Sequence, residues 1–221
     1  ANCTFQSGSI GVVGDVTVTG AGSDWVCKVA MSAADTAGAV TFTIDGTDLA
    51  GNPLTQVTGT TDGSSITFNK NAPSLTEVAI ASSNTAPSAA VTDDTITLTF
   101  TSSEPMTQSG DSPLRCAFRT GGDAVTGSAI AVTDTGGGTA WSCTYTVVAG
   151  DTAGAVSFTI DGSDLAGNAL VQVTSATDDS SIVIDRTPPS LSNVSISSNN
   201  AISSSRARDN DKVTLTFTSS E

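Results

Sequence analysis

The sequence predicts an all-β protein that consists of tandem antiparallel β-sandwich repeats. Three observations carry this prediction: a long internal repeat, strict alternation of apolar and hydroxylated residues, and clusters of turn-forming residues between the alternating runs. No stretch of the chain shows the apolar periodicity of an amphipathic helix.

The internal repeat covers most of the chain. Residues 35–52 (DTAGAVTFTIDGTDLAGN) return almost unchanged as residues 151–168 (DTAGAVSFTIDGSDLAGN), an offset of 116 residues from Asp35 to Asp151. A second echo, residues 95–104 (TITLTFTSSE) against 212–221 (KVTLTFTSSE), predicts that a further repeat begins near the C-terminal end. A period of this length is the size of one β-sandwich domain.

Alternation predicts the strands. Ile96, Leu98 and Phe100 alternate with threonines, which is the pattern of a strand with one buried face and one hydroxylated, solvent-facing side. The same pattern recurs at residues 40–44, 156–160 and 213–217. In the second repeat we expect strands near residues 75–81, 95–102, 115–119, 127–133, 140–147, 155–161 and 180–185. Seven short strands per repeat predict an antiparallel sandwich with immunoglobulin-like topology.

Proline-containing joints divide the chain. Residues 71–74 (NAPS) and 186–190 (RTPPS) are expected to act as linkers that the fixed proline φ stiffens. We therefore expect one complete central Ig-like domain over residues 71–187, flanked by two partial ones. Residues 1–70 are expected to form the C-terminal part of a domain that lacks its first two strands, and residues 188–221 the first two strands of a next domain.

Four cysteines occur at equivalent places of the two repeats. Cys3 with Cys27, and Cys116 with Cys143, have a spacing that suits one disulfide within each repeat, with a Trp two residues before the second Cys. Paired cysteines favour an oxidising compartment over four free thiols in a cytosolic protein. A zinc site is disfavoured, because C-x-x-C spacing and histidines are both lacking in the sequence.

Composition excludes several classes of function. The formal charge is −14, with 8 basic and 22 acidic residues, which disfavours binding to nucleic acid and to anionic membranes. The sequence has no stretch of 18 or more apolar residues, so we expect no membrane insertion. It contains no His, the commonest general base, and no nucleophile motif stands out, so the protein is not expected to be an enzyme.

Three segments resemble a known family. In order along the chain, FTSSEP (100–105), FTIDGSDLAGN (158–168) and IDRTPPS (184–190) resemble the tandem bacterial-type immunoglobulin-like (Big-type) repeat domains of extracellular surface or fibre proteins. The resemblance extends over essentially the whole chain. It implies an extracellular or cell-surface location and a role as spacer, adhesin or fibre subunit. The cysteine pairs depart from the usual pattern of bacterial members.

Acidic turns are candidate calcium ligands. In arrays related by this resemblance, acidic loops and linkers hold Ca²⁺ between domains, and hard carboxylate oxygens suit that ion. The competing interpretation is an Asx turn, in which the carboxylate caps its own backbone. The equivalent of Asp185 in the first repeat is Asn69, which argues against a strictly repeated site, and no cofactor is required. The candidate ligands are Asp45, Asp48, Asp161, Asp164 and Asp185.

Two N-glycosylation sequons are present. Asn2-Cys-Thr4 and Asn193-Val-Ser195 match the acceptor pattern, and alternation places both Asn side chains outward. The threonine-rich faces and the Thr-Pro-Pro-Ser joint are also candidates for O-linked sugar. The competing interpretation is an ordinary solvated strand face, which threonine suits by propensity.

These features together predict a structural repeat subunit of an extracellular filament or cell-surface appendage. Its partners are expected to be copies of itself in a head-to-tail fibre, in which strands from the neighbouring unit, or from the continuing chain, complete the partial domains. The alternative is an adhesin stalk or ligand-binding surface module with carbohydrate as a partner.

Overall fold

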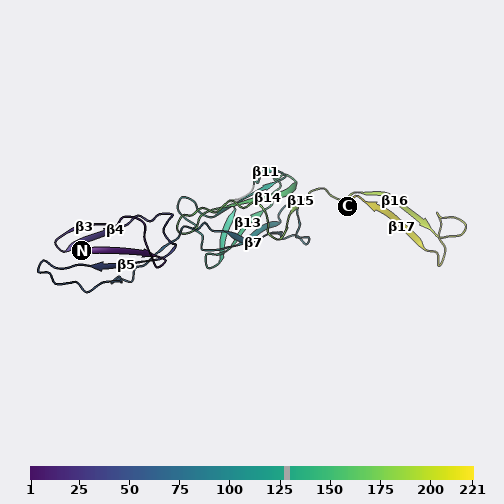
Figure 1. Cartoon of the computed structure of the whole chain (residues 1–221). Helices are drawn as coiled ribbons and strands as arrows, with labels where there is room; N and C mark the ends of the chain where they lie inside the picture. Colours follow the sequence, from purple (N-terminus) through teal and green to yellow (C-terminus); the bar gives the residue numbers. More distant parts are fainter. Residues whose placement is uncertain (127–129) are drawn as a thin grey trace.

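The computed structural model describes residues 1–126 and 130–221. All regular elements in these residues are β-strands, and nearly all strand pairs are antiparallel. The chain forms three segments that follow one another along the molecule (Figure 1): an N-terminal segment (residues 1–70), a central segment (71–187) and a C-terminal segment (188–221). Among the described residues, no helix has the length and apolar character to cross a bilayer.

The central segment contains two sheets. One has the order β12-β13-β9-β7, and the other has the order β11-β10-β14-β15-β8. β8 and β15 are parallel, whereas the other pairs are antiparallel. The strand bounds are β7 Leu75–Ser82, β8 Ala89–Ala90, β9 Thr95–Ser102, β10 Arg115–Thr120, β11 Asp123–Ala124, β12 Ala131–Gly136, β13 Ala140–Thr146, β14 Gly154–Asp161 and β15 Val183–Ile184.

The hydrophobic core lies between these two sheets. The alternating residues predicted to face inward are buried: Leu98 from β9, Trp141 from β13 and Ile160 from β14 belong to one contiguous cluster. Phe118 of β10 and Tyr145 of β13 approach across the core with ring centroids 6.1 Å apart. This arrangement is that of a β-sandwich, because each sheet buries one face against the other.

The N-terminal segment repeats most of this pattern. Its four-stranded sheet has the order β2-β1-β5-β6, and β3 and β4 form a separate hairpin. The bounds are β1 Asn2–Ser7, β2 Ile10–Gly11, β3 Thr17–Ala21, β4 Asp24–Lys28, β5 Gly38–Asp45 and β6 Ile66–Phe68. By the 116-residue offset, β4 and β5 correspond to β13 and β14, and β1 corresponds to β10 because Cys3 takes the place of Cys116.

The C-terminal segment is a two-stranded hairpin. Strand β16 (Leu191–Ser198) pairs antiparallel with β17 (Val213–Ser219), and these strands correspond to β7 and β9 of the central segment. Every residue of β17 is exposed. An isolated hairpin of this kind has only marginal stability in water unless another element covers its apolar face.

Several predicted strand bounds change in the structure. The strand expected at 127–133 is found as β12 at Ala131–Gly136, where it pairs with β13, and residues 127–129 of the prediction lie outside the described residues. The strand expected at 180–185 is shorter, at Val183–Ile184. The two-residue strands β8 and β11 were not predicted, because alternation cannot be recognised over two residues.

A matched pair of substitutions tests whether the equivalent strands β9 and β17 differ in packing as described. We expect Leu98→Ala to lower the free energy of unfolding of the central segment by about 2–5 kcal/mol, because it leaves a cavity in the core. Leu215→Ala, at the equivalent position of β17, should change the free energy of unfolding of the dilute, unassembled chain by less than about 0.5 kcal/mol. Urea unfolding measures both, and equal losses would contradict the difference in packing.

Candidate strand-docking interface

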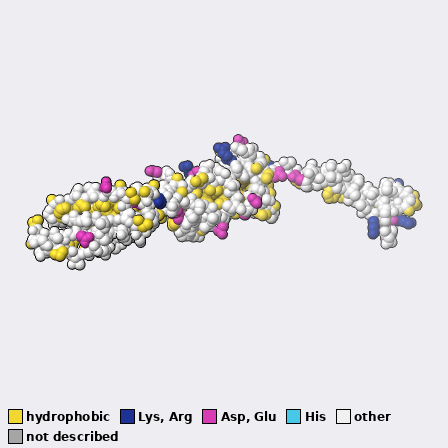
Figure 2. Space-filling model, in the orientation of Figure 1, with side chains coloured by type: hydrophobic (Ala, Val, Ile, Leu, Met, Phe, Trp, Pro, Cys, Tyr) yellow, Lys and Arg dark blue, Asp and Glu magenta, His cyan; other side chains and the backbone are white. Residues whose placement is uncertain are grey.

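The N-terminal segment has an open apolar groove where the central segment has a closed core. Trp25 is 50% exposed, whereas its counterpart Trp141 is 2% exposed, and Ile66 is 70% exposed against 1% for Ile182. Phe5 and Phe42 line the same groove beside Trp25. The space-filling view shows hydrophobic side chains running along this segment (Figure 2). Large exposed apolar patches of this kind mark interaction surfaces.

The edge of strand β4 beside this groove has no neighbour among the described residues. In the central segment, β13 pairs with β12 on one side and with β9 on the other. In the N-terminal segment, the corresponding strand β4 pairs only with β3. Its other edge therefore presents unpaired backbone N–H and C=O groups that a further strand can satisfy.

The C-terminal hairpin exposes the side chains that such a strand would bury. Leu215 is 58% exposed and Phe217 57% exposed, whereas their counterparts Leu98 and Phe100 are 0% and 2% exposed. On β16, Val194 and Ile196 are likewise exposed, and they correspond to the buried Val78 and Ile80. The groove and the hairpin therefore expose complementary halves of one sandwich core.

The hairpin already has the conformation of its packed counterpart. Both pairs carry a bulge at the equivalent place, between Thr76 and Ala79 in β7 and between Ser192 and Ser195 in β16. The connecting loops share a side-chain clamp as well. The Asn84 amide donates to Asp94 at 2.8 Å, and the Asn200 amide donates to Asp211 at 2.6 Å. The bulge and the loop clamp favour the packed conformation of the hairpin, which lowers the entropic cost of ordering the hairpin on docking.

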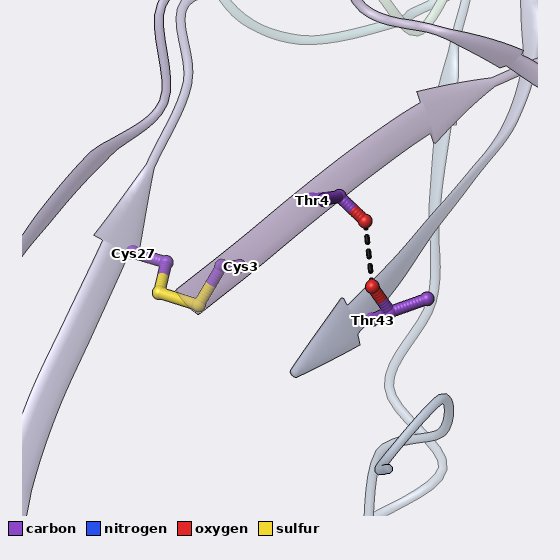
Figure 3. Close-up of a disulfide and its surroundings, with 4 residues drawn as sticks. All are labelled: Cys3, Thr4, Cys27 and Thr43. Atoms are coloured by element: carbon purple, nitrogen blue, oxygen red, sulfur yellow. Dashed lines mark hydrogen bonds between the residues drawn. A yellow bond between two sulfur atoms is a disulfide. The ribbon is translucent and has the colours of Figure 1, made fainter. Parts of the chain in front are cut away.

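Disulfides connect the two sheet layers of both segments. Cys3 of β1 is bonded to Cys27 of β4 (Figure 3), and Cys116 of β10 is bonded to Cys143 of β13. These are the pairs that the spacing predicted, and they indicate an oxidising compartment. In the N-terminal segment, the bond holds the β3–β4 hairpin against the four-stranded sheet. It therefore keeps the two walls of the open groove together before anything fills it.

The candidate calcium ligands accept hydrogen bonds from their own turns. Asp48 accepts the backbone N–H groups of Ala50 and Asn52 and the Asn52 side-chain amide, and the Asn52 side chain is the main cause of a lowered pKa of Asp48. Asp164 accepts the same set from Ala166 and Asn168. These contacts support the Asx-turn interpretation at both positions.

The remaining acidic candidates also have protein partners. Asp45 accepts from Gln56, Asp161 accepts from Gln172, and Asp185 accepts the backbone N–H of Thr187. Asp161 also lies 3.9 Å from the Arg115 guanidinium, measured between charged atoms. The described residues include no group of three or more potential metal-ligating side chains placed to hold one ion. A calcium ion in a single chain would therefore have to displace existing hydrogen bonds.

Both sequon asparagines are exposed. Asn2 lies on β1 opposite Asp45, and Asn193 lies at the bulge of β16 with a positive φ of 50°. The counterpart of Asn193 is Glu77, which is also exposed and also has a positive φ, of 52°. The bulge therefore turns this position outward in a packed sheet, and a glycan there would not obstruct docking.

Sequence reasoning identified the cysteines and the inward-facing strand residues of this interface. It did not identify Asn69, which joins the N-terminal segment to the central one. The Asn69 amide donates to Asp164 at 2.8 Å and to Glu104. The one signal in the sequence was that Asn69 is equivalent to Asp185, the candidate ligand at the next joint.

Comparisons of the chain with protein-family models, curated proteins and solved structures find no match.

Acidification tests the side-chain clamp in the β7–β9 unit. The Val91 backbone N–H, followed by the Asn84 amide, lowers the pKa of Asp94. The pKa of Asp94 in the folded chain therefore lies below the unfolded value of about 3.9. The ionised Asp94 carboxylate contributes its whole stabilisation above pH ~4, and this stabilisation is lost as the pH falls through the folded-state pKa. The free energy of unfolding of the central segment should fall between neutral pH and about pH 3, and we expect this fall to be smaller in the Asp94→Asn protein.

Urea unfolding midpoints at the two pH values measure this effect. Asp93→Asn removes the same charge at the neighbouring position, and its loss of stability on acidification should match that of the unsubstituted chain. An equal loss in all three proteins would show that the Asp94 clamp does not contribute.

Proposed function

We propose that this protein is a structural repeat subunit of an extracellular filament or cell-surface appendage, built from Big-type Ig-like domains and assembled head to tail. The C-terminal hairpin of one copy docks into the groove of the N-terminal segment of the next copy. The residues of two copies thereby form one composite sandwich, and composite sandwiches alternate along the fibre with the central segments.

The observation that carries the proposal is complementary exposure. Leu98 of β9 lies opposite Cys143 of β13, and Phe100 lies opposite Trp141. The equivalent pairs in the composite sandwich are Leu215 opposite Cys27 and Phe217 opposite Trp25, with β17 antiparallel to the free edge of β4. Full burial of a Leu or Phe side chain contributes about 1.5–3 kcal/mol, so several such residues provide a substantial driving force.

The positions of the donor and acceptor favour assembly between copies over closure within one chain. The hairpin and the N-terminal segment lie on opposite sides of the central segment (Figure 1). A head-to-tail contact between two different surfaces does not close on itself unless the rotation happens to form a ring, so it generates an open fibre. A continuing chain that carries the same repeat could supply the hairpin covalently, with the same contacts.

The chemistry of the chain supports an extracellular setting. Disulfides persist in oxidising compartments, and a net charge of −14 keeps unassembled subunits soluble. Asn2 and Asn193 belong to the composite sandwich and lie on its outer faces, so we propose them as glycan attachment sites that leave the docking surfaces free. Calcium at the acidic turns belongs to this proposal as an accessory ligand that docking does not require.

The second candidate function is an adhesin stalk or ligand-binding surface module. The exposed Trp25 in the apolar groove favours it, since aromatic residues in grooves commonly bind partners. In that case the groove would hold a carbohydrate or a foreign protein segment. Such a module would not require the matching hairpin, and a chain that stays monomeric at high concentration would support it.

A pair of substitutions in β17 tests the proposal. We expect Leu215→Glu to weaken head-to-tail association by ~100-fold or more, because loss of a buried Leu contact alone costs about 3 kcal/mol and each 1.4 kcal/mol or so is a tenfold change. Thr216→Glu is the matched control, because its counterpart Thr99 is exposed in the packed sheet. Sedimentation velocity and negative-stain electron microscopy measure the assembly.

Equal assembly of the two variants would show that this face of β17 is not buried between copies. Docking should also move Trp25 from water into a core. A blue shift of tryptophan emission with rising concentration is expected for the Thr216→Glu protein and not for the Leu215→Glu protein.

A further inference from the structure

Successive joints of the proposed fibre differ at one residue. The first joint lies between the N-terminal and central segments of one chain. There, the Asn69 amide donates to the carboxylates of Glu104 and Asp164, and the Asn168 amide donates to the backbone carbonyl of Asn69 at 3.3 Å. Asp164 is 1% exposed, so its carboxylate depends on protein donors for its hydrogen bonds. Asn69 thus acts as a neutral donor between two acids and clamps this joint.

The second joint lies between the central segment and the composite sandwich, and this inference therefore rests on the proposed function. By the repeat, Glu221 takes the place of Glu104, and Asp48 of the next copy takes the place of Asp164. The place of Asn69 is taken by Asp185. The two acids of the clamp are therefore kept, while the donor between them becomes a third acid.

Asp185 does not supply the hydrogen-bond donor that Asn69 supplies at the first joint. Asn69 uses its side-chain oxygen to accept the backbone N–H of Asn71, and its amide nitrogen points to the acids. Asp185 uses one oxygen in the same way, to accept the backbone N–H of Thr187. Its second oxygen therefore occupies the place of the amide nitrogen, where an ionised carboxylate repels the two facing acids instead of donating to them.

The basic residues beside the joints do not neutralise this arrangement. Arg186 follows Asp185, but its guanidinium donates to the carbonyls of Val148 and Ala149 within the central segment. Lys70, its counterpart at the first joint, donates in the same manner to the carbonyls of Ala33 and Asp35. In the composite sandwich of the proposed fibre, the groups that face the second oxygen of Asp185 are therefore the carboxylates of Glu221 and of Asp48 from the next copy.

We propose that the joint at Asp185 is a hinge between copies, whereas the joint at Asn69 is a fixed clamp. At neutral pH, repulsion among three carboxylates keeps the second joint open and free to bend. The fibre then alternates between stiff and flexible joints.

Reciprocal substitutions test this hinge. Asn69→Asp places three carboxylates at the first joint, and we expect small-angle scattering of the unassembled chain at neutral pH to show a broader range of segment arrangements. Asn71→Asp adds the same charge two residues away and should leave the scattering unchanged. An Asn69→Asp chain that scatters like the unsubstituted chain would overturn the proposal without reference to assembly.

The second joint is tested in assembled fibres. We expect electron micrographs at neutral pH to show bending at every second joint, and Asp185→Asn to remove that bending. Straight unsubstituted fibres at neutral pH, or bending that Asp185→Asn does not remove, would overturn the hinge.

Failure of the proposed function would be recognised separately. If unsubstituted chains form no fibres, head-to-tail docking is wrong, and the assignment of a hinge to Asp185 falls with it. The scattering of the Asn69→Asp chain would still report whether an acid at this position opens a joint.

Discussion

An apolar sheet face must be covered, and the rest of this structure depends on that constraint. The central segment satisfies it within its own residues, because β7 and β9 place their apolar side chains against the opposite sheet. The flanking segments contain the same strand sequences without the covering partner. Their apolar side chains are therefore exposed at the positions where the central segment buries them. The proposed assembly would cover these side chains in the arrangement that β7 and β9 adopt in the central segment.

The disulfide and the bulged hairpin make this arrangement compatible with separate docking partners. Binding to a groove whose walls could separate would carry a large cost in conformational entropy. The Cys3–Cys27 bond limits that separation by linking β1 to β4. The hairpin contributes its own order through the bulge in β16 and the Asn200–Asp211 contact. In the proposed assembly, these features reduce the ordering that docking requires, and β17 supplies the backbone hydrogen bonds that the free edge of β4 lacks.

Sequence reasoning predicted the features that depend on local alternation and on the internal repeat. Alternation located the strands that form the core, and the repeat predicted the two cysteine pairs and the incomplete flanking segments. It did not predict β8, β11 or the parallel pairing of β8 with β15, because two-residue strands carry no periodic signal. The contact of Asn69 with Glu104 and Asp164 was also missed, since it joins residues up to 95 positions apart and depends on how two segments meet. The acidic turns were recognised, and their hydrogen bonds support the Asx-turn interpretation.

Cross-linking between copies tests the central claim most directly. Ser142 of β13 lies opposite Thr99 of β9 in the central segment, so Val26 of one copy should lie opposite Thr216 of another. The account predicts that a chain with Val26→Cys and Thr216→Cys forms a ladder of covalent oligomers on a non-reducing denaturing gel, whereas each single substitution yields no species larger than a dimer. A double variant that stays monomeric or stops at the dimer under oxidising, concentrated conditions would contradict head-to-tail strand docking.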